Sequence, residues 1–413
     1  MPWCRYLKPY YLVIFVILII NTALYLHPST ELSAVDNTSY AELEVGKEHE
    51  APSCDPAMTV VTVICGKKQR RLRQLAALVR SMLFFTSCPL RLIILTDDVK
   101  LITARFGKMA SAPLFKKSNA VLEIRMVEYP EYLKEKRTMW HSFGPCLTLR
   151  LFFASVLPEL DAIIYIDTDV FAVSPIEKFW EIFKSMNGTQ FMAVVAEAGG
   201  HPDIWPWYGR VSRTPYVGAS GLNAGVIPMN LTRMRRFGWE DEVLAAYEKY
   251  ESDFKLIDQD LVNIVLHDHP EGFMSLPHEW NFRNWLCPHA RGSWMKEFLP
   301  PNVTAKMLHG DSSNPRDVSK LYYYPFYAAI QKLNIHQGNK DYTKQIVEPV
   351  IELMKLPFRA QRHRCAALDE NLLRSIEDLD PKTRSQTSSC ATRSPGFFGS
   401  FVNFLFCSFQ FSF

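Results

Sequence analysis

The chain has 413 residues, 48% of them hydrophobic and 22% charged, which suits one large or two ordinary globular domains and excludes a mainly disordered chain. Its 46 Lys and Arg residues nearly balance 43 Asp and Glu residues, leaving a formal net charge of +3. This balance argues against a sequence-independent nucleic-acid binder, because such a protein needs a concentrated basic surface.

An uncharged apolar run, residues 10–26 (YYLVIFVILIINTALYL), lies near the N-terminus. Its length is at the short limit for a helix that crosses a bilayer. Arg5 and Lys8 precede it, so the positive-inside rule predicts a cytosolic tail (1–9), a signal-anchor transmembrane helix (10–26) and a lumenal remainder. A cleaved signal peptide is the alternative, but no small-x-small site closes the run cleanly.

Residues 27–57 are largely polar and acidic without a helical or alternating period, and we interpret them as a lumenal stem. A lumenal body agrees with the Asn-x-Ser/Thr glycosylation sequons, at Asn37, Asn187, Asn230 and Asn302. Several cysteines could form disulfides in that setting, with a connectivity that the sequence leaves open: Cys54, Cys65, Cys88, Cys146, Cys287 and Cys365.

Residues 58–358 alternate short apolar runs with helical stretches, which predicts an α/β layer fold. No G-x-G-x-x-G or G-x-x-x-x-G-K-[ST] loop is present, which weakens a dehydrogenase or P-loop interpretation. We expect strands at 59–65, 90–95, 122–128, 162–166, 191–196 and 225–229. We expect helices at 67–83, 146–157, 175–186 (opened by a capping box from Ser174 to Glu177), 240–250 and 259–266.

Asp167-Thr168-Asp169 directly follows the apolar run AIIYI. Ligands of open α/β sheets gather beyond the carboxyl ends of strands. Two carboxylates there can hold a hard divalent cation, which can stabilise a departing diphosphate. An ordinary polar turn is the simpler alternative.

Downstream, His309-Gly310 offers an imidazole that would complete an oxygen and nitrogen shell suited to manganese. An ordinary loop histidine is the alternative. Residues 267–269 (HDH) resemble a metal cluster, but we interpret them as a solvated helix end.

Two further strings carry polar side chains that suit a sugar. Asn223 lies in a glycine-rich segment, where the backbone could approach a ligand closely. Asp258 and Gln259 begin the string DQDLVN. Asp258 is either the N-cap of the following helix or, with Gln259, a group at the mouth of a ligand-binding cleft.

The C-terminal segment, 359–413, stays unassigned. From residue 394 onward it carries no charge, and Phe is its commonest residue. A second membrane-touching segment is one interpretation; a disordered hydrophobic tail or a mis-predicted terminal exon is favoured.

Taken in order, these motifs resemble the retaining, metal-dependent glycosyltransferases of family 8, which have the GT-A nucleotide-diphospho-sugar transferase fold with a mixed central sheet. Within that family, residues 207–210, 215–216, 218–225, 229–233 and 277–283 (PHEWNFR) resemble the glucoside xylosyltransferases. Those enzymes are type II membrane proteins of the Golgi or endoplasmic reticulum. They transfer xylose from UDP-xylose, in α1,3 linkage, to O-linked glucose on EGF-like repeats such as those of Notch.

The resemblance assigns roles to individual residues. It implies a manganese site formed by Asp167, Asp169 and His309, and catalytic positions at Asp258 and Gln259. It implies donor-binding positions at Val63, Cys65, Gly66, Arg150, Asp167, Thr168, Asn223 and Gly310. The Lys-Pro-Trp that follows the His-Gly pair in many members is absent here, and Arg316 or Lys320 are the candidate phosphate partners.

Three questions stay open. Retention of configuration requires front-face attack, which we favour, or a covalent intermediate on Asp258. Trp205, Trp207 and Tyr208 are either an acceptor platform or a loop anchor. The alternative functions are another family 8 transferase, specific for glucose, galactose or a second xylose, and an inactive GT-A domain that only binds.

Overall fold

The computed structural model describes residues 58–128, 130–134, 145–197, 211–283, 304–310, 323–336, 340–354, 372–376 and 379. All of them belong to one compact unit, residues 52–413. Within these ranges, no helix is both long enough and apolar enough to span a bilayer. The run at 10–26 lies outside the described residues, so the anchor and the stem stay predictions.

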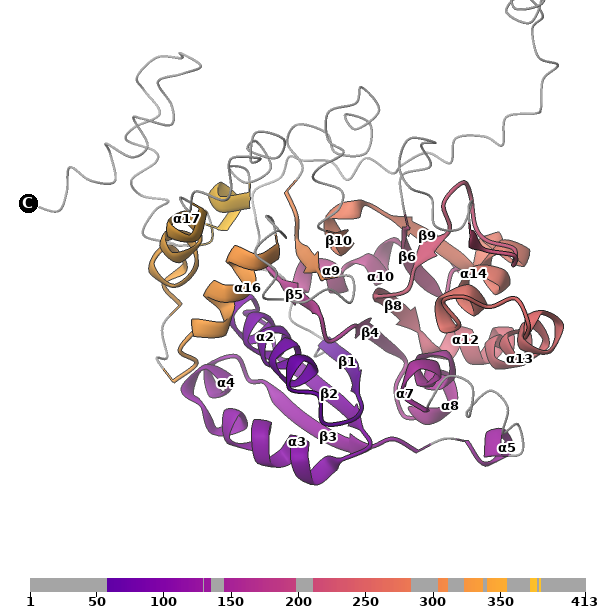
Figure 1. Ribbon diagram of the computed structural model, residues 1–413, viewed down its shortest axis with the longest axis horizontal. Coiled ribbons are helices and arrows are strands. Elements are labelled where there is room, and N and C mark those ends of the chain that lie inside the picture. The colour runs from indigo at the N-terminus through magenta and orange to yellow at the C-terminus, as the bar shows by residue number, and fades with distance from the viewer. Residues whose placement is uncertain are drawn as a thin grey trace, which may run out of the picture. The chain divides into compact units, whose positions relative to one another are not determined.

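The centre of the fold is an eight-stranded mixed sheet in the order β3-β2-β1-β4-β8-β6-β7, with β9 paired to β6 (Figure 1). β1, β2, β3 and β4 run parallel, whereas β8 is antiparallel to β4. The expected mixed sheet is therefore confirmed. Its strands are β1 (Met58–Ile64), β2 (Leu90–Thr96), β3 (Val121–Met126), β4 (Ala162–Ile166), β6 (Met192–Ala196), β7 (Leu222–Asn223), β8 (Val226–Asn230) and β9 (Phe273–Leu276).

A small second sheet, in the order β10-β11-β5, adjoins the end of β4. Its strands are β5 (Val170–Ala172), β10 (Phe282–Arg283) and β11 (Met307–His309). β5 follows β4 after a three-residue turn, and β11 runs antiparallel to it with His309 opposite Val170. This pairing brings a residue from far along the chain to the end of β4.

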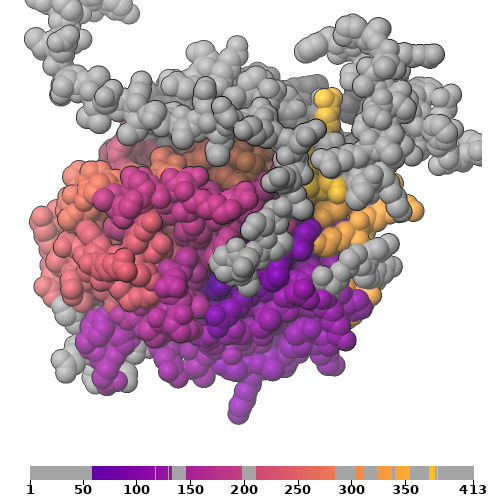
Figure 2. Space-filling model, turned by 180° about the vertical axis from the view of Figure 1, so that it is seen from behind, coloured from indigo at the N-terminus to yellow at the C-terminus, as the bar shows by residue number. Residues whose placement is uncertain are grey.

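Helices cover both faces of the central sheet, as α/β architecture requires. In β1, Val60 and Ile64 pack into one core cluster with α2 (Gln69–Phe85) and α16 (Tyr323–Lys332). Val61, which lies between them, packs into the other cluster, with α13 (Trp239–Tyr250) and α14 (Asp258–Asp268). This alternation is the period of two expected of a strand buried on both faces. Figure 2 shows the molecule from behind, with the purple residues of the N-terminal part on one side and the coral residues, in the colour range of α13 and α14, on the other.

The helices that pack in the core cluster of Val60 and Ile64 are α2 (Gln69–Phe85), α3 (Val99–Phe106), η1 (Gly107–Ser111), α4 (Pro113–Lys117), α9 (Glu177–Trp180), α10 (Ile182–Ser185), α16 (Tyr323–Lys332), η6 (Thr343–Val347) and α17 (Glu348–Met354). The remaining ones are α5 (Glu131–Lys134), α7 (Pro145–Thr148), η2 (Leu149–Phe152), α8 (Phe153–Val156), α12 (Leu231–Phe237), α13 (Trp239–Tyr250), α14 (Asp258–Asp268), η3 (Pro270–Gly272) and η4 (His278–Asn281).

Two expected helices are shorter and broken. The segment 146–157 divides into α7, η2 and α8, and the segment 175–186 into α9 and α10. The expected capping box is wrong, because the Glu177 carboxylate accepts hydrogen bonds from the Thr86 hydroxyl at 3.0 Å and the Ser87 N–H at 2.7 Å. Glu177 thereby ties the end of α2 to α9.

Part of the unassigned C-terminal segment belongs to the core. Residues 372–376 form a short helix, and Leu372 and Ile376 are buried in the same cluster as α16 and α17. The Phe-rich end lies outside the described residues.

Candidate active site

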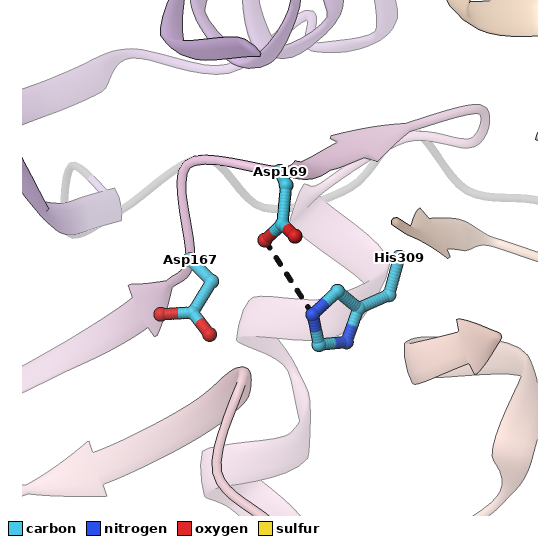
Figure 3. A group of neighbouring side chains, drawn as sticks. All are labelled: Asp167, Asp169 and His309. Atoms are coloured by element: carbon cyan, nitrogen blue, oxygen red, sulfur yellow. Dashed lines mark ion pairs between the residues drawn. The ribbon is translucent and has the colours of Figure 1, made fainter. Parts of the chain in front are cut away.

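Asp167, Asp169 and His309 come together where β4, β5 and β11 meet (Figure 3). One ligand atom from each lies within 4.8 Å of the others, and His309 Nε2 is 3.5 Å from Asp169 Oδ1. Asp169 and His309 are buried and Asp167 is half-buried. Two carboxylates and one imidazole are a donor set that fits a divalent cation such as manganese. The structure thus brings together the three residues that the sequence singled out.

Backbone hydrogen bonds hold the two aspartates in a tight turn. The Asp167 N–H donates to the Gly225 carbonyl at 2.8 Å, and the Val170 N–H donates back to the Asp167 carbonyl at 3.1 Å. The Asp169 carbonyl accepts from the Gly310 N–H and from the Tyr323 hydroxyl, both at 2.9 Å. Gly310 thus joins the turn that carries both aspartates to β11.

Gly225 leaves room for the histidine ring. A Cβ at this position would lie 2.4 Å from His309 Cε1 and 3.0 Å from His309 Nδ1. The sequence suggested that glycines here admit a ligand to the backbone. The structure gives Gly225 a different purpose, because the group that approaches it is the protein's own imidazole.

Arg150 links the aspartates of the site. Its guanidinium lies 3.3 Å from Asp167 Oδ1, donates to the Ala224 carbonyl at 2.5 Å, and forms an ion pair with Asp258. Burial alone would lower the pKa of Arg150, but the charges of Asp167 and Asp258 raise it above its ordinary value. Burial raises the pKa of Asp258 to about 6, against the opposing effect of Arg150. Arg150 therefore stays charged in a site that is mostly screened from water.

Asp258 is the first residue of α14 and not its N-cap, so that interpretation is wrong. Asp260 binds the helix entrance instead: its Oδ2 accepts from the N–H groups of Lys255, Leu256 and Ile257 at 2.7, 2.6 and 3.0 Å. The Asp258 carboxylate is thereby left to pair with Arg150.

Asn223 and Gln259 meet at a carboxylate that the sequence did not single out. Glu197 Oε2 accepts from Asn223 Nδ2 at 2.8 Å and from Gln259 Nε2 at 3.1 Å. Its other oxygen pairs with Arg283, which is 1% exposed. Glu197 directly follows β6 and Arg283 ends the string at 277–283. The rule that functional groups follow strand ends could have found Glu197.

Three of the expected donor-binding residues, Val63, Cys65 and Gly66, lie at the end of β1. Gly66 has a φ of +75°, a conformation that favours glycine, and its N–H points at the Asp97 carboxylate (3.0 and 3.1 Å). Cys65 forms a disulfide with Cys146, with Cα atoms 6.0 Å apart. The disulfide joins the end of β1 to α7, which leads to Arg150, and Val63 lies on β1 nearby.

Of the remaining candidates, Thr168 belongs to the turn of the Asp167, Asp169 and His309 cluster, and the others lie elsewhere. Thr168 lies within the turn between Asp167 and Asp169. His267 and Asp268 are exposed at the end of α14 and pair with each other at 2.8 Å, as a solvated helix end should. The candidates outside the described residues are Asn37, Asn302, Trp205, Trp207, Tyr208, Arg316, Lys320 and the cysteines Cys54, Cys287 and Cys365.

The two described sequons differ in accessibility. Asn187 is exposed, and its Oδ1 accepts from the N–H groups of Thr189 and Gln190. Asn230 is partly buried and caps α12, because its Oδ1 accepts from the Arg233 N–H at 2.9 Å. Asn187 is therefore more open to a bulky N-linked glycan than the partly buried Asn230.

Comparison with known proteins adds an independent line of evidence. Residues 62–301 match the family described as glycosyl transferase family 8. The chain is 30% identical to glucoside xylosyltransferase 1 of Mus musculus, across 80% of this chain and 81% of that one, and 30% identical to the Homo sapiens protein of the same name, across 72% and 67%. In fold it is similar to the bifunctional glycosyltransferase WbbM (TM-score 0.50, 17% identity, 74% of this chain and 51% of that one).

Proposed function

The chain belongs to glycosyl transferase family 8, and on that premise we propose that it transfers xylose from UDP-xylose, with retention and in α1,3 linkage, to O-linked glucose on EGF-like repeats. The observation that carries the proposal is the Asp167, Asp169 and His309 cluster, with Asn223 and Gln259 beside it. The names of the relatives support xylose as the sugar and a glucoside as the acceptor.

Asp167, Asp169 and His309 would hold the metal, for which we propose Mn²⁺. When bound, such a cation neutralises the negative charge that develops on a departing diphosphate. Arg150 supplies a second, permanent positive charge 3.3 Å from Asp167. Burial makes that charge more effective than it would be in water.

The transferred pentose would lie over Asn223, Asp258 and Gln259. We favour front-face attack, in which an oxygen of the leaving phosphate takes the acceptor proton. The ion pair between Asp258 and Arg150 supports this choice, because the carboxylate would have to break a buried pair before it could attack the anomeric carbon. Asp258 then orients the sugar hydroxyls and does not form a covalent bond.

The test uses residues 27–413 produced through a secretory pathway. The protein is incubated with Mn²⁺, an O-glucosylated EGF-like acceptor and one of UDP-xylose, UDP-glucose or UDP-galactose, and products are weighed by mass spectrometry. We expect a pentose on the acceptor, lost on chelation and in Asp169→Asn. Transfer of a hexose would instead make UDP-glucose or UDP-galactose the donor. This outcome needs only a small change in the pocket, because one hydroxymethyl group is worth only about 1–3 kcal/mol of discrimination. No transfer from any donor would contradict the enzyme and favour a domain that only binds.

We also propose a type II topology in the Golgi or endoplasmic reticulum membrane, supported by the apolar run at 10–26 and the exposed sequon at Asn187. In protein taken from cells, endoglycosidase treatment should increase the electrophoretic mobility of the wild type more than that of Asn187→Gln, because the wild type loses one more glycan. A protein that carries no glycan at any sequon would contradict a lumenal catalytic domain.

A further inference from the structure

The segment 277–283 (PHEWNFR) carries the resemblance to glucoside xylosyltransferases, and its last residue, Arg283, pairs with Glu197. One of its residues, Asn281, lies directly between the metal ligand and the sugar site and is fully buried. Its Nδ2 donates to Asn223 Oδ1 at 2.7 Å, and its Oδ1 lies 2.8 Å from His309 Nδ1. Asn281 therefore bridges two residues that would otherwise act independently.

The orientation of each amide along this bridge follows from fixed donors and acceptors. The Gly225 N–H can only donate, so the Asn223 atom 3.0 Å from it is the oxygen. At its other end, Asn223 faces the Glu197 carboxylate, which accepts, so that atom is the nitrogen. Because the Asn223 oxygen faces Asn281, the amide of Asn281 must turn its nitrogen to Asn223 and its oxygen to His309.

This orientation determines which nitrogen of His309 carries the hydrogen. An amide oxygen only accepts, so His309 Nδ1 must be the protonated nitrogen. In a neutral imidazole the other nitrogen, Nε2, then carries a lone pair. Nε2 is the atom that faces Asp169 Oδ1 at 3.5 Å, where two acceptors would repel unless a cation lies between them.

We propose that Asn281 is a positioning residue that holds His309 in the tautomer that binds metal through Nε2 and couples this ligand to Asn223. The inference rests on the proposed function for the identity of the metal. A second partner of this kind typically contributes 10–100-fold in metal affinity. The coupling also means that disturbing Asn281 affects the sugar site and the metal site together.

The test measures Mn²⁺ binding by calorimetry in the absence of donor and acceptor, for the wild type and three variants. Asn281→Leu removes both hydrogen bonds, and we expect the Kd for Mn²⁺ to rise about 10–100-fold. Asn281→Asp keeps an acceptor for His309 Nδ1–H but cannot donate to Asn223, so we expect a Kd within about threefold of wild type and a raised KM for the donor. Asn263→Leu is the matched control for metal affinity, since Asn263 is equally buried but bonds the backbone of Leu222 and Gln259 and no metal ligand, and its Kd for Mn²⁺ should stay near wild type.

An unchanged Kd in folded Asn281→Leu, or an equal loss in Asn281→Asp, would overturn the proposal. If Asn281→Leu does not fold, the ¹⁵N chemical shifts of the His309 ring in metal-free wild type decide: hydrogen on Nδ1 supports the proposal and hydrogen on Nε2 refutes it. Wild-type protein that binds Mn²⁺ but transfers no xylose would contradict the proposed function and leave this inference intact.

Discussion

The contact between Gly225 and His309 yields the sharpest prediction, for Gly225→Ala. The added Cβ would lie 2.4 Å from His309 Cε1, whereas carbon atoms normally approach to about 3.5 Å, so the ring would have to move by about 1 Å. The ring is buried and bonded to Asn281, so it cannot swing into solvent. Metal–ligand distances tolerate only about 0.2 Å.

We therefore expect Gly225→Ala to weaken Mn²⁺ binding by at least about tenfold and to lower transfer at limiting metal, with partial recovery at high Mn²⁺. Calorimetry gives the affinity, and a thermal melt verifies that the variant folds. Gly107→Ala is the control, because its Cβ would meet only the Thr103 methyl, at an ordinary 3.5 Å. A folded Gly225→Ala that binds Mn²⁺ as tightly as wild type would refute the geometry of the site.

Three further predictions concern stability. Arg283→Met should cost about 3 kcal/mol of unfolding free energy, the low end for breaking a buried ion pair, because it leaves the partly buried Glu197 carboxylate without its buried partner. Adding Glu197→Leu should recover part of this loss, and additive losses in urea melts would argue against the pair. Replacing Cys65 and Cys146 together by Ser should cost about 4.5 kcal/mol, the loop entropy for a sequence separation of 81, and an unchanged denaturation midpoint would contradict the disulfide. Burial, aided by Arg283, lowers the pKa of His278 to about 4, so the folded state resists a proton that the unfolded state binds below pH 6.5. The contribution of His278 to the free energy of unfolding should therefore be fully present above pH 6.5. Between pH 6.5 and 4 the free energy of unfolding of the wild type should fall by about 3 kcal/mol relative to that of His278→Gln, and parallel pH profiles of the two proteins would refute this.

Most strands could be predicted because their signal is local. β1, β2 and β4 are short runs of branched apolar residues buried on both faces, and each lies within about a residue of its expected bounds. The single helix predicted at 146–157 is instead three short helices, α7, η2 and α8. Leu149, Arg150, Leu151 and Phe152 are all buried, so no single apolar face exists and packing decides the local geometry.

For the site, the sequence by itself determined the chemical types: two carboxylates after a strand, an imidazole downstream, and amides between them. Only the tertiary structure decided how they are supported. Glu197 meets Arg283 across 86 residues, and Asn281 meets His309 across 28. Such contacts depend on how β6, β10 and β11 pack. The end of a strand is determined by a few adjacent residues and can therefore be predicted locally. The partner of a buried polar group depends on the tertiary fold, because folding removes both groups from water together.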